Sequence, residues 1–94
     1  MTIRIVQAKF AEEHKDRVMN ALEEAEKAFP KIPGVVGFQC GAASEDNDEY
    51  DLAFLVEFDA FEDVEGYLAS KVHEDFANKH LRPFATVVAR NYEI

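Results

Sequence analysis

The sequence predicts an α+β fold with the element order βαββαβ, in which an antiparallel sheet carries both helices on one face. Three features support this prediction: four segments rich in β-branched and aromatic residues, two segments whose apolar residues recur at helical spacing, and a short polar loop between the second and third strands. The 94 residues are 48% hydrophobic and 12% aromatic, which is typical of a folded chain with one modest core. We therefore predict a single domain over residues 1–94.

The first strand and the first helix are predicted over residues 2–10 and 11–29. The segment TIRIVQAKF is rich in β-branched residues and places Arg4 and Phe10 on the same face of its strand. Apolar residues recur three or four positions apart through the helix, and PKIPG at 30–34 ends it because proline cannot continue a helix.

The second and third strands are predicted over residues 35–42 and 50–58 and form an antiparallel hairpin. SEDNDE at 44–49 joins them and is dense in side chains that bond their own backbone, so we expect a turn there. The segment lacks the glycine and the ligand spacing of an EF-hand, so calcium binding is not expected.

A second helix is predicted over residues 59–80, with a break near Ala69 or Ser70. Its apolar residues again recur at helical spacing, and Pro83 ends it. The segment FATVVARNYEI at 84–94 has the composition of a fourth strand.

Two of the strands are apolar on both faces. Residues 52–56 and 84–88 present apolar side chains at successive positions, which a sheet covered on one face does not need. Two helices cover only one face, so the opposite face requires another surface, and a second copy of the chain supplies it most simply. We predict a homodimer with the sheets packed face to face.

The charge balance limits the classes of partner. The net charge is −9, and the ten basic residues are scattered, so neither nucleic acid nor an anionic membrane surface is an expected partner. No apolar run is long enough to cross a bilayer, and the first ten residues lack the pattern of a signal peptide. The single cysteine, Cys40, excludes an internal disulfide and suits a reducing compartment, so we predict a cytoplasmic protein.

Neither a metal nor a cofactor is predicted. His73 and His80 are seven residues apart, whereas helical metal pairs more often use a spacing of three or four, and no third ligand is evident. His80 is expected to be partly exposed near the end of its helix, and no glycine-rich phosphate loop is present.

Several short motifs, in order, resemble one known family. They are IRIVQAKF, IPGV, FQCG, LVEFDAFEDVEGYLASKVHEDF and VVARNYEI, and together they span nearly the whole chain. They are similar to the stress-responsive dimeric α/β-barrel family, abbreviated Dabb. The resemblance implies a ferredoxin-like protomer whose sheet joins that of a partner into a barrel.

The resemblance also implies a pocket between the helices and the sheet. The family includes heat-stable plant stress proteins and a polyketide cyclase that closes an aromatic ring by intramolecular aldol condensation. In the cyclase a tyrosine and a histidine six residues apart line the pocket, and Tyr67 and His73 match them. Two further cyclase histidines correspond to Arg4 and Leu52, where this chain departs from the pattern. Cofactor-free monooxygenases share the topology but carry a tryptophan, which this chain lacks.

Three polar residues are the candidates for chemistry. His73 is a candidate general base because its ordinary pKa is close to neutral, and Tyr67 is a candidate hydrogen-bond donor. Residues six apart lie on different faces of a continuous helix, so Tyr67 and His73 can face the same pocket only if the helix breaks near residue 70. The alternative is that His73 only packs against the sheet. Arg4 either holds an anionic group of a ligand, such as a carboxylate, or pairs with an acidic side chain.

We interpret the chain as a binding protein for a small, largely apolar metabolite, with a role in stress response implied by the resemblance. The predicted ligand-binding wall consists of Arg4, Phe10, Leu22, Leu52, Phe54 and Phe76, beside Tyr67 and His73. One alternative is a cofactor-independent cyclase, isomerase, lyase or monooxygenase with His73 as base. Another is an interaction module whose dimer surface is its whole function.

Overall fold

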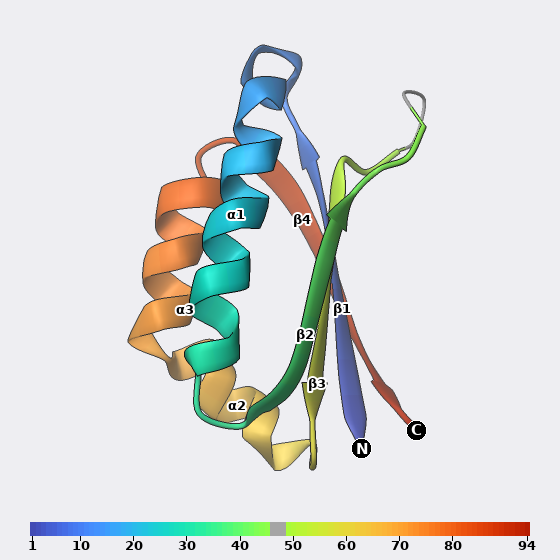
Figure 1. The fold of residues 1–94 in the computed structure, drawn as a ribbon, viewed down its shortest axis with the longest axis vertical. Helices are drawn as coiled ribbons and strands as arrows, with labels where there is room; N and C mark the ends of the chain where they lie inside the picture. Colours follow the sequence, from blue (N-terminus) through green and yellow to red (C-terminus); the bar gives the residue numbers. More distant parts are fainter. Residues whose placement is uncertain (46–48) are drawn as a thin grey trace.

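The computed structural model describes residues 1–45 and 49–94, and its element order agrees with the predicted βαββαβ order (Figure 1). The four strands form one antiparallel sheet in the order β2-β3-β1-β4. Their bounds are Thr2–Phe10 for β1, Val35–Ala42 for β2, Leu52–Phe58 for β3 and Ala85–Glu93 for β4. The predicted turn at 44–49 includes residues 46–48, which lie outside the described residues.

The first helical segment differs from its prediction in one respect. Residues Glu12–Arg17 form a 3₁₀ turn, and the α-helix α1 extends over Val18–Ala28, so only part of the expected helix 11–29 is α-helical. A second short 3₁₀ turn, Phe29–Lys31, ends it where Pro30 enters.

The second helical segment consists of three pieces. Helix α2 covers Glu62–Ala69, helix α3 covers Lys71–Phe76, and a π-helical turn follows over Ala77–Leu81. Helices α1, α2 and α3 all lie on the same face of the sheet (Figure 1). Within residues 1–45 and 49–94, none of the helices has the length and apolarity needed to cross a membrane.

The start of β3 is fixed by Asp51. Its N–H donates to the carbonyl of Ala8 at 2.8 Å, and its carboxylate accepts from the N–H of Phe10 at 2.7 Å. The Lys15 ammonium binds the same carboxylate at 2.7 Å. Asp51 therefore ties the hairpin to the end of β1, and the strand begins one residue after it rather than at the predicted residue 50.

The core lies between the helices and the inner face of the sheet. Alternate residues of β3 are buried, as expected for a strand with one face on the core. The strand side chains of this core are Val6, Ala8, Phe10, Leu52, Phe54, Val56 and Phe58, and the helices contribute Ala21, Leu22, Ala25, Val64, Tyr67 and Phe76.

No described helix covers the outer face of the sheet (Figure 1). Its apolar side chains stand next to one another across the strands, since Ile5 pairs with Leu55 and Ile3 pairs with Tyr92. Tyr92 is 53% exposed. We call this surface the outer apolar face; its members are Ile3, Ile5, Ala53, Leu55, Val88 and Tyr92.

Candidate ligand pocket between helices and sheet

A break at Ser70 separates α2 from α3 and shapes the candidate site. Ser70 has extended backbone angles, φ −63° and ψ 136°, and its hydroxyl accepts a hydrogen bond from the N–H of Val72 at 3.2 Å. It is therefore the N-cap of a new helix. The change of direction brings the rings of Tyr67 and His73 to a centroid distance of 4.7 Å. The predicted break is present, and it brings the two residues together as expected.

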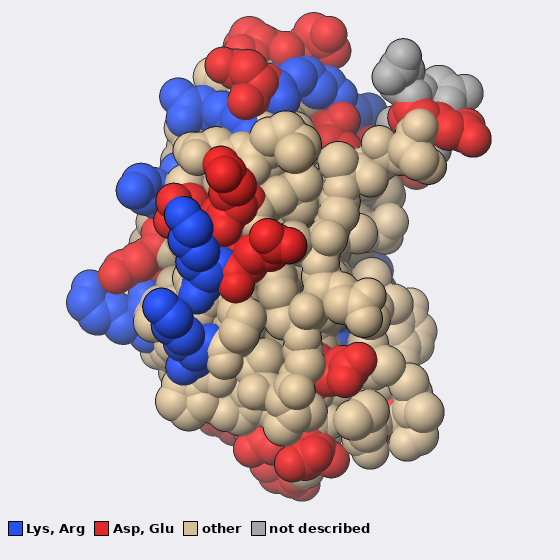
Figure 2. All heavy atoms as spheres, viewed as in Figure 1, with Lys and Arg blue, Asp and Glu red and all other residues tan. Residues whose placement is uncertain are grey.

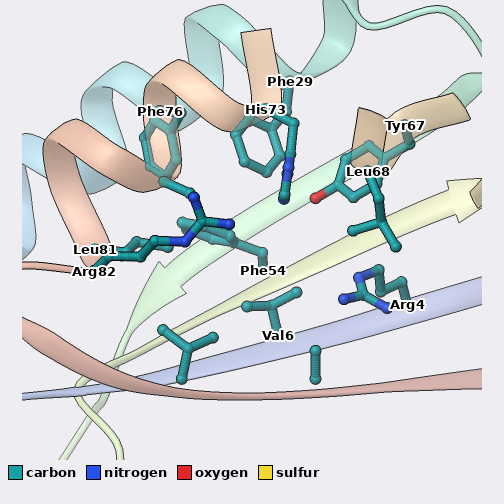
Figure 3. Close-up of a pocket in the computed structure, with 13 residues that line it drawn as sticks. Arg4, Val6, Phe29, Phe54, Tyr67, Leu68, His73, Phe76, Leu81 and Arg82 are labelled. Carbon is teal, nitrogen blue, oxygen red and sulfur yellow. The ribbon is translucent and has the colours of Figure 1, made fainter. Parts of the chain in front are cut away.

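A pocket of about 260 Å³ lies beside these two rings, between the helices and strands β1, β3 and β4 (Figure 3). Five of the predicted residues line it: Arg4, Phe54, Tyr67, His73 and Phe76. The other lining residues are Val6, Phe29, Leu68, Ala77, Leu81, Arg82, Val87 and Ala89.

Three residues of the predicted wall lie elsewhere. Phe10, Leu22 and Leu52 are buried in the core and do not line this pocket. Phe10 is six residues along β1 from Arg4, which separates the two by roughly 20 Å at the rise of a β-strand. Leu52 pairs with Ala8 toward the same end of the sheet as Phe10. Strand alternation correctly predicted that Phe10 and Leu52 lie on the inner face of the sheet. It could not predict how far along the strands they are from the pocket.

The lining residues that were not predicted come from strands β1 and β4 and from the helical segments, which contribute Phe29, Leu68, Ala77 and Leu81. Val87 and Ala89 line the pocket from the inner face of β4, and the neighbouring β1 strand contributes Val6. Period-two alternation along β4 was the signal that could have found the first two. Arg82 reaches the pocket from the turn that follows α3, and no sequence pattern indicated its direction.

The imidazole of His73 is largely buried, with 16% of its side chain exposed. Its Nδ1 atom is buried and has no hydrogen-bond partner, and the nearest carboxylate oxygen, from Glu74, is 3.9 Å away. Burial lowers the pKa of His73, the Glu74 charge opposes this, Arg4 and Arg82 lower the pKa further, and the backbone of Leu68 raises it slightly. His73 is therefore neutral at neutral pH and able to accept a proton.

Tyr67 is fully buried as a residue, but its hydroxyl points toward His73 and the pocket (Figure 3). Burial raises the pKa of Tyr67 to about 12, with a small opposing effect of Arg4. The phenol therefore keeps its proton and is a hydrogen-bond donor. Its ring packs edge-on against Phe58 and Phe29, with centroid distances of 5.2 and 5.9 Å, which holds it in place.

Arg4 lies on the inner face of β1 beside the pocket. Its Nη1 donates to the side-chain oxygen of Asn91 at 3.1 Å, and its buried Nε has no partner. Within the described parts of the chain, no carboxylate lies at ion-pair distance from Arg4. Of the two alternatives that the sequence left open, pairing with an acidic side chain is therefore not observed among these residues.

Comparison with known proteins identifies the family. The family model of the stress-responsive A/B barrel domain, Dabb, matches residues 3–94. The chain belongs to this family. The resemblance predicted from short motifs is thereby confirmed.

Solved structures of similar proteins confirm the ferredoxin-like fold of the Dabb chain. A dimeric protein of unknown function from Bacteroides fragilis has a TM-score of 0.84 and 26% identity, over 99% of this chain and 95% of that one. A dimeric ferredoxin-like protein of unknown function from Thermobifida fusca has a TM-score of 0.84 and 20% identity, over 100% and 92%. A Dabb family protein from Mesorhizobium loti has a TM-score of 0.76 and 21% identity, over 99% and 96%. The comparison with curated proteins gives no match.

The charge of the Dabb pocket is opposite in sign to that of the chain. The net charge is −9, and acidic side chains are spread over the visible surface (Figure 2). The pocket lining nevertheless includes Arg4, Arg82 and His73 and no carboxylate. Arg82 is already paired with Glu74 at 3.0 Å, whereas the described residues offer Arg4 only the neutral amide of Asn91.

No metal centre is formed by the described residues, since they contain no group of three or more histidine, cysteine or acidic side chains able to hold a metal ion. His80, which we expected to be partly exposed, is buried and packs on Phe76 with a centroid distance of 4.9 Å. The neighbouring helix α1 is the reason, because its Glu24 and Ala28 lie beside His80 in the same surface hollow.

Proposed function

We propose that this Dabb chain binds a small, largely apolar metabolite in the pocket beside Tyr67 and His73, with a role in stress response. The observation that carries the proposal is a preformed cavity of about 260 Å³ with an apolar wall and four polar side chains, Arg4, Tyr67, His73 and Arg82. An interaction module whose dimer surface is its whole function needs no such open space, because side chains would fill it.

We also propose that the chain acts as a homodimer through the outer apolar face. That face is left without a cover by the helices, and burying it removes apolar area from water. The similar proteins from Bacteroides fragilis and Thermobifida fusca are described as dimeric. The predicted cytoplasmic location rests on the sequence and stays a prediction.

Native mass spectrometry of the protein purified from its own host tests the binding function. We expect a retained small molecule in the natural protein and its loss in Ala89→Phe, because Ala89 lines the pocket and a phenyl ring there fills it. Ala43→Phe, at an exposed position, is the matched control and should retain the molecule. Retention in both variants, or in neither, would contradict binding in this pocket.

A cofactor-independent enzyme is the second candidate, and one observation favours it. His73 lines the pocket, has a lowered pKa and lies against a protonated Tyr67, which are the properties of a general base beside a hydrogen-bond donor. Incubation of the retained molecule with fresh protein separates the two functions. A binding protein returns it unchanged, whereas a cyclase, isomerase, lyase or monooxygenase converts it, and His73→Ala then loses the conversion.

A further inference from the structure

We propose that the ligand of this pocket is an organic anion with one carboxylate, held by Arg4, and an apolar body the size of a substituted ring. The inference rests on the proposed binding function and specifies the chemical class of the ligand.

The unpaired donors of Arg4 provide the first argument. Its Nη1 is occupied by Asn91, but Nε is buried and donates to nothing. A buried N–H without an acceptor is unfavourable, and a charged one more so. A carboxylate in the pocket can accept from the terminal guanidinium donors that Asn91 leaves free, and it supplies the counter-charge that the buried part of this cation lacks.

The balance of charge provides the second argument. Arg82 is neutralised by Glu74, whereas Arg4 is a lining cation without a counter-charge among residues 1–45 and 49–94. A cationic ligand would be repelled by Arg4, and a neutral apolar ligand would leave its charge unbalanced. An anion supplies both the missing charge and the missing acceptor.

Tyr67 supplies a second donor for the same group. It keeps its proton at neutral pH because burial raises its pKa to about 12. Its hydroxyl points toward His73 (Figure 3), and the charge of Arg4 is near enough to lower the pKa of Tyr67 slightly. The pocket is therefore lined by two donors from different elements, Arg4 of β1 and Tyr67 of α2.

The other end of the pocket fits an apolar body. Phe54, Phe76 and Leu81 line it, away from Arg4 and Tyr67, and the charge of Arg82 beside them is already paired with Glu74 (Figure 3). An engineered apolar cavity of about 150 Å³ holds benzene. A pocket of about 260 Å³ therefore has room for a ring with a short side chain that ends in a carboxylate.

Calorimetric titration of the full chain at neutral pH, with three probes of one carbon skeleton, tests this inference. The probes are 3-phenylpropionate, its neutral isostere 3-phenylpropionamide, and the cation 3-phenylpropylammonium. We expect the acid to bind about ten- to a hundredfold more tightly than the amide, which is the range for a charge-assisted hydrogen bond, and the cation most weakly.

Variants test whether Arg4 causes the preference for the acid over the amide. In Arg4→Gln the acid should lose its advantage over the amide, whereas Lys27→Gln, which removes the same charge from an exposed position on α1, should keep it. Arg4→Lys retains the charge without the planar fork and should show an intermediate preference. Circular dichroism of each variant checks that it is folded.

The outcomes distinguish this inference from the binding function. Equal affinities for acid and amide, or a preference that survives Arg4→Gln, would overturn the carboxylate assignment and leave the pocket function intact. A retained natural molecule without an acidic group would have the same meaning. If no probe binds and no molecule is retained, both the inference and the proposed function fail.

Discussion

At the scale of single residues, the main feature of the site is that polar side chains are buried without all of their hydrogen-bond partners. His73 and Arg4 each place a polar nitrogen in the interior with no partner, and most buried polar groups in proteins do have one. Tyr67 differs because burial only reinforces its neutral form. All three side chains also line the pocket, so a bound ligand would lie against them.

The first prediction concerns the titration of His73. Its folded-state pKa is lowered, so it should titrate below the ordinary value of about 6.5, with a higher midpoint in Arg4→Gln because Arg4 lowers it. Below about pH 6.5 the unfolded chain therefore binds more protons at this residue than the folded chain does. The contribution of neutral His73 to the free energy of unfolding is complete above that pH, and it falls as the pH drops toward the folded-state pKa.

Two measurements check this prediction. Nuclear magnetic resonance of the imidazole resonances gives the midpoint, and urea unfolding at pH 7 and pH 5 gives the loss of stability. His73→Gln, which does not titrate, should lose less stability between these pH values; burial also lowers the pKa of His80, so some loss remains. A His73 midpoint at or above 6.5 would contradict the buried, cation-flanked environment.

At the scale of elements, the interruption of the second helix decides whether a site exists. A continuous helix over residues 62–76 would place Tyr67 and His73 on different sides, since six residues are well short of two full turns. The extended backbone at Ser70 removes that constraint, and its hydroxyl starts α3. Phe29 at the end of α1 then packs on both rings and on Phe76.

The second prediction tests this cap. Ser70→Ala removes the acceptor for the Val72 N–H and should lower the free energy of unfolding by about 0.5–2 kcal/mol, as at other N-caps. Ser44→Ala, at an exposed loop position, is the control and should change it by less than about 0.5 kcal/mol. Urea unfolding measures both. Equal stability of the two variants would show that the backbone at Ser70 does not depend on its hydroxyl.

At the scale of the whole molecule, the two faces of the sheet have different surroundings. Helices cover one face of the sheet and enclose the pocket, while none of the described helices covers the outer apolar face (Figure 1). The pocket lies on the helix side of the sheet, so two copies joined through their outer faces would hold two pockets.

The third prediction concerns assembly. We expect the natural protein to sediment with twice the 10.7 kDa chain mass, and Leu55→Glu to shift it toward one chain, because a charge in the centre of the outer apolar face is costly to bury. Met19→Glu adds the same charge at an exposed apolar residue of α1 and should stay dimeric. Analytical ultracentrifugation at micromolar concentration decides the matter, and a single-chain mass for the natural protein would rule the dimer out.

Local signals in the sequence were sufficient for the fold. Residues 2–10 and 35–42 became strands with the predicted bounds, because alternation and β-branched composition act over a few neighbours. The start of α1 at Val18 was missed, since the preceding 3₁₀ turn has the same helical periodicity over so short a stretch. The break near residue 70 was predicted, but its exact cap was not.

The sequence by itself determined the family, the element order and the pairing of Tyr67 with His73 around a break. Only the tertiary structure decided which inner-face residues reach the pocket, because Phe10 and Arg4 share a face of β1 while standing far apart along it. It also decided that Arg4 meets Asn91 and no described carboxylate. Side-chain partners across a sheet depend on strand order and register, which join residues 87 positions apart and leave no local trace in the sequence.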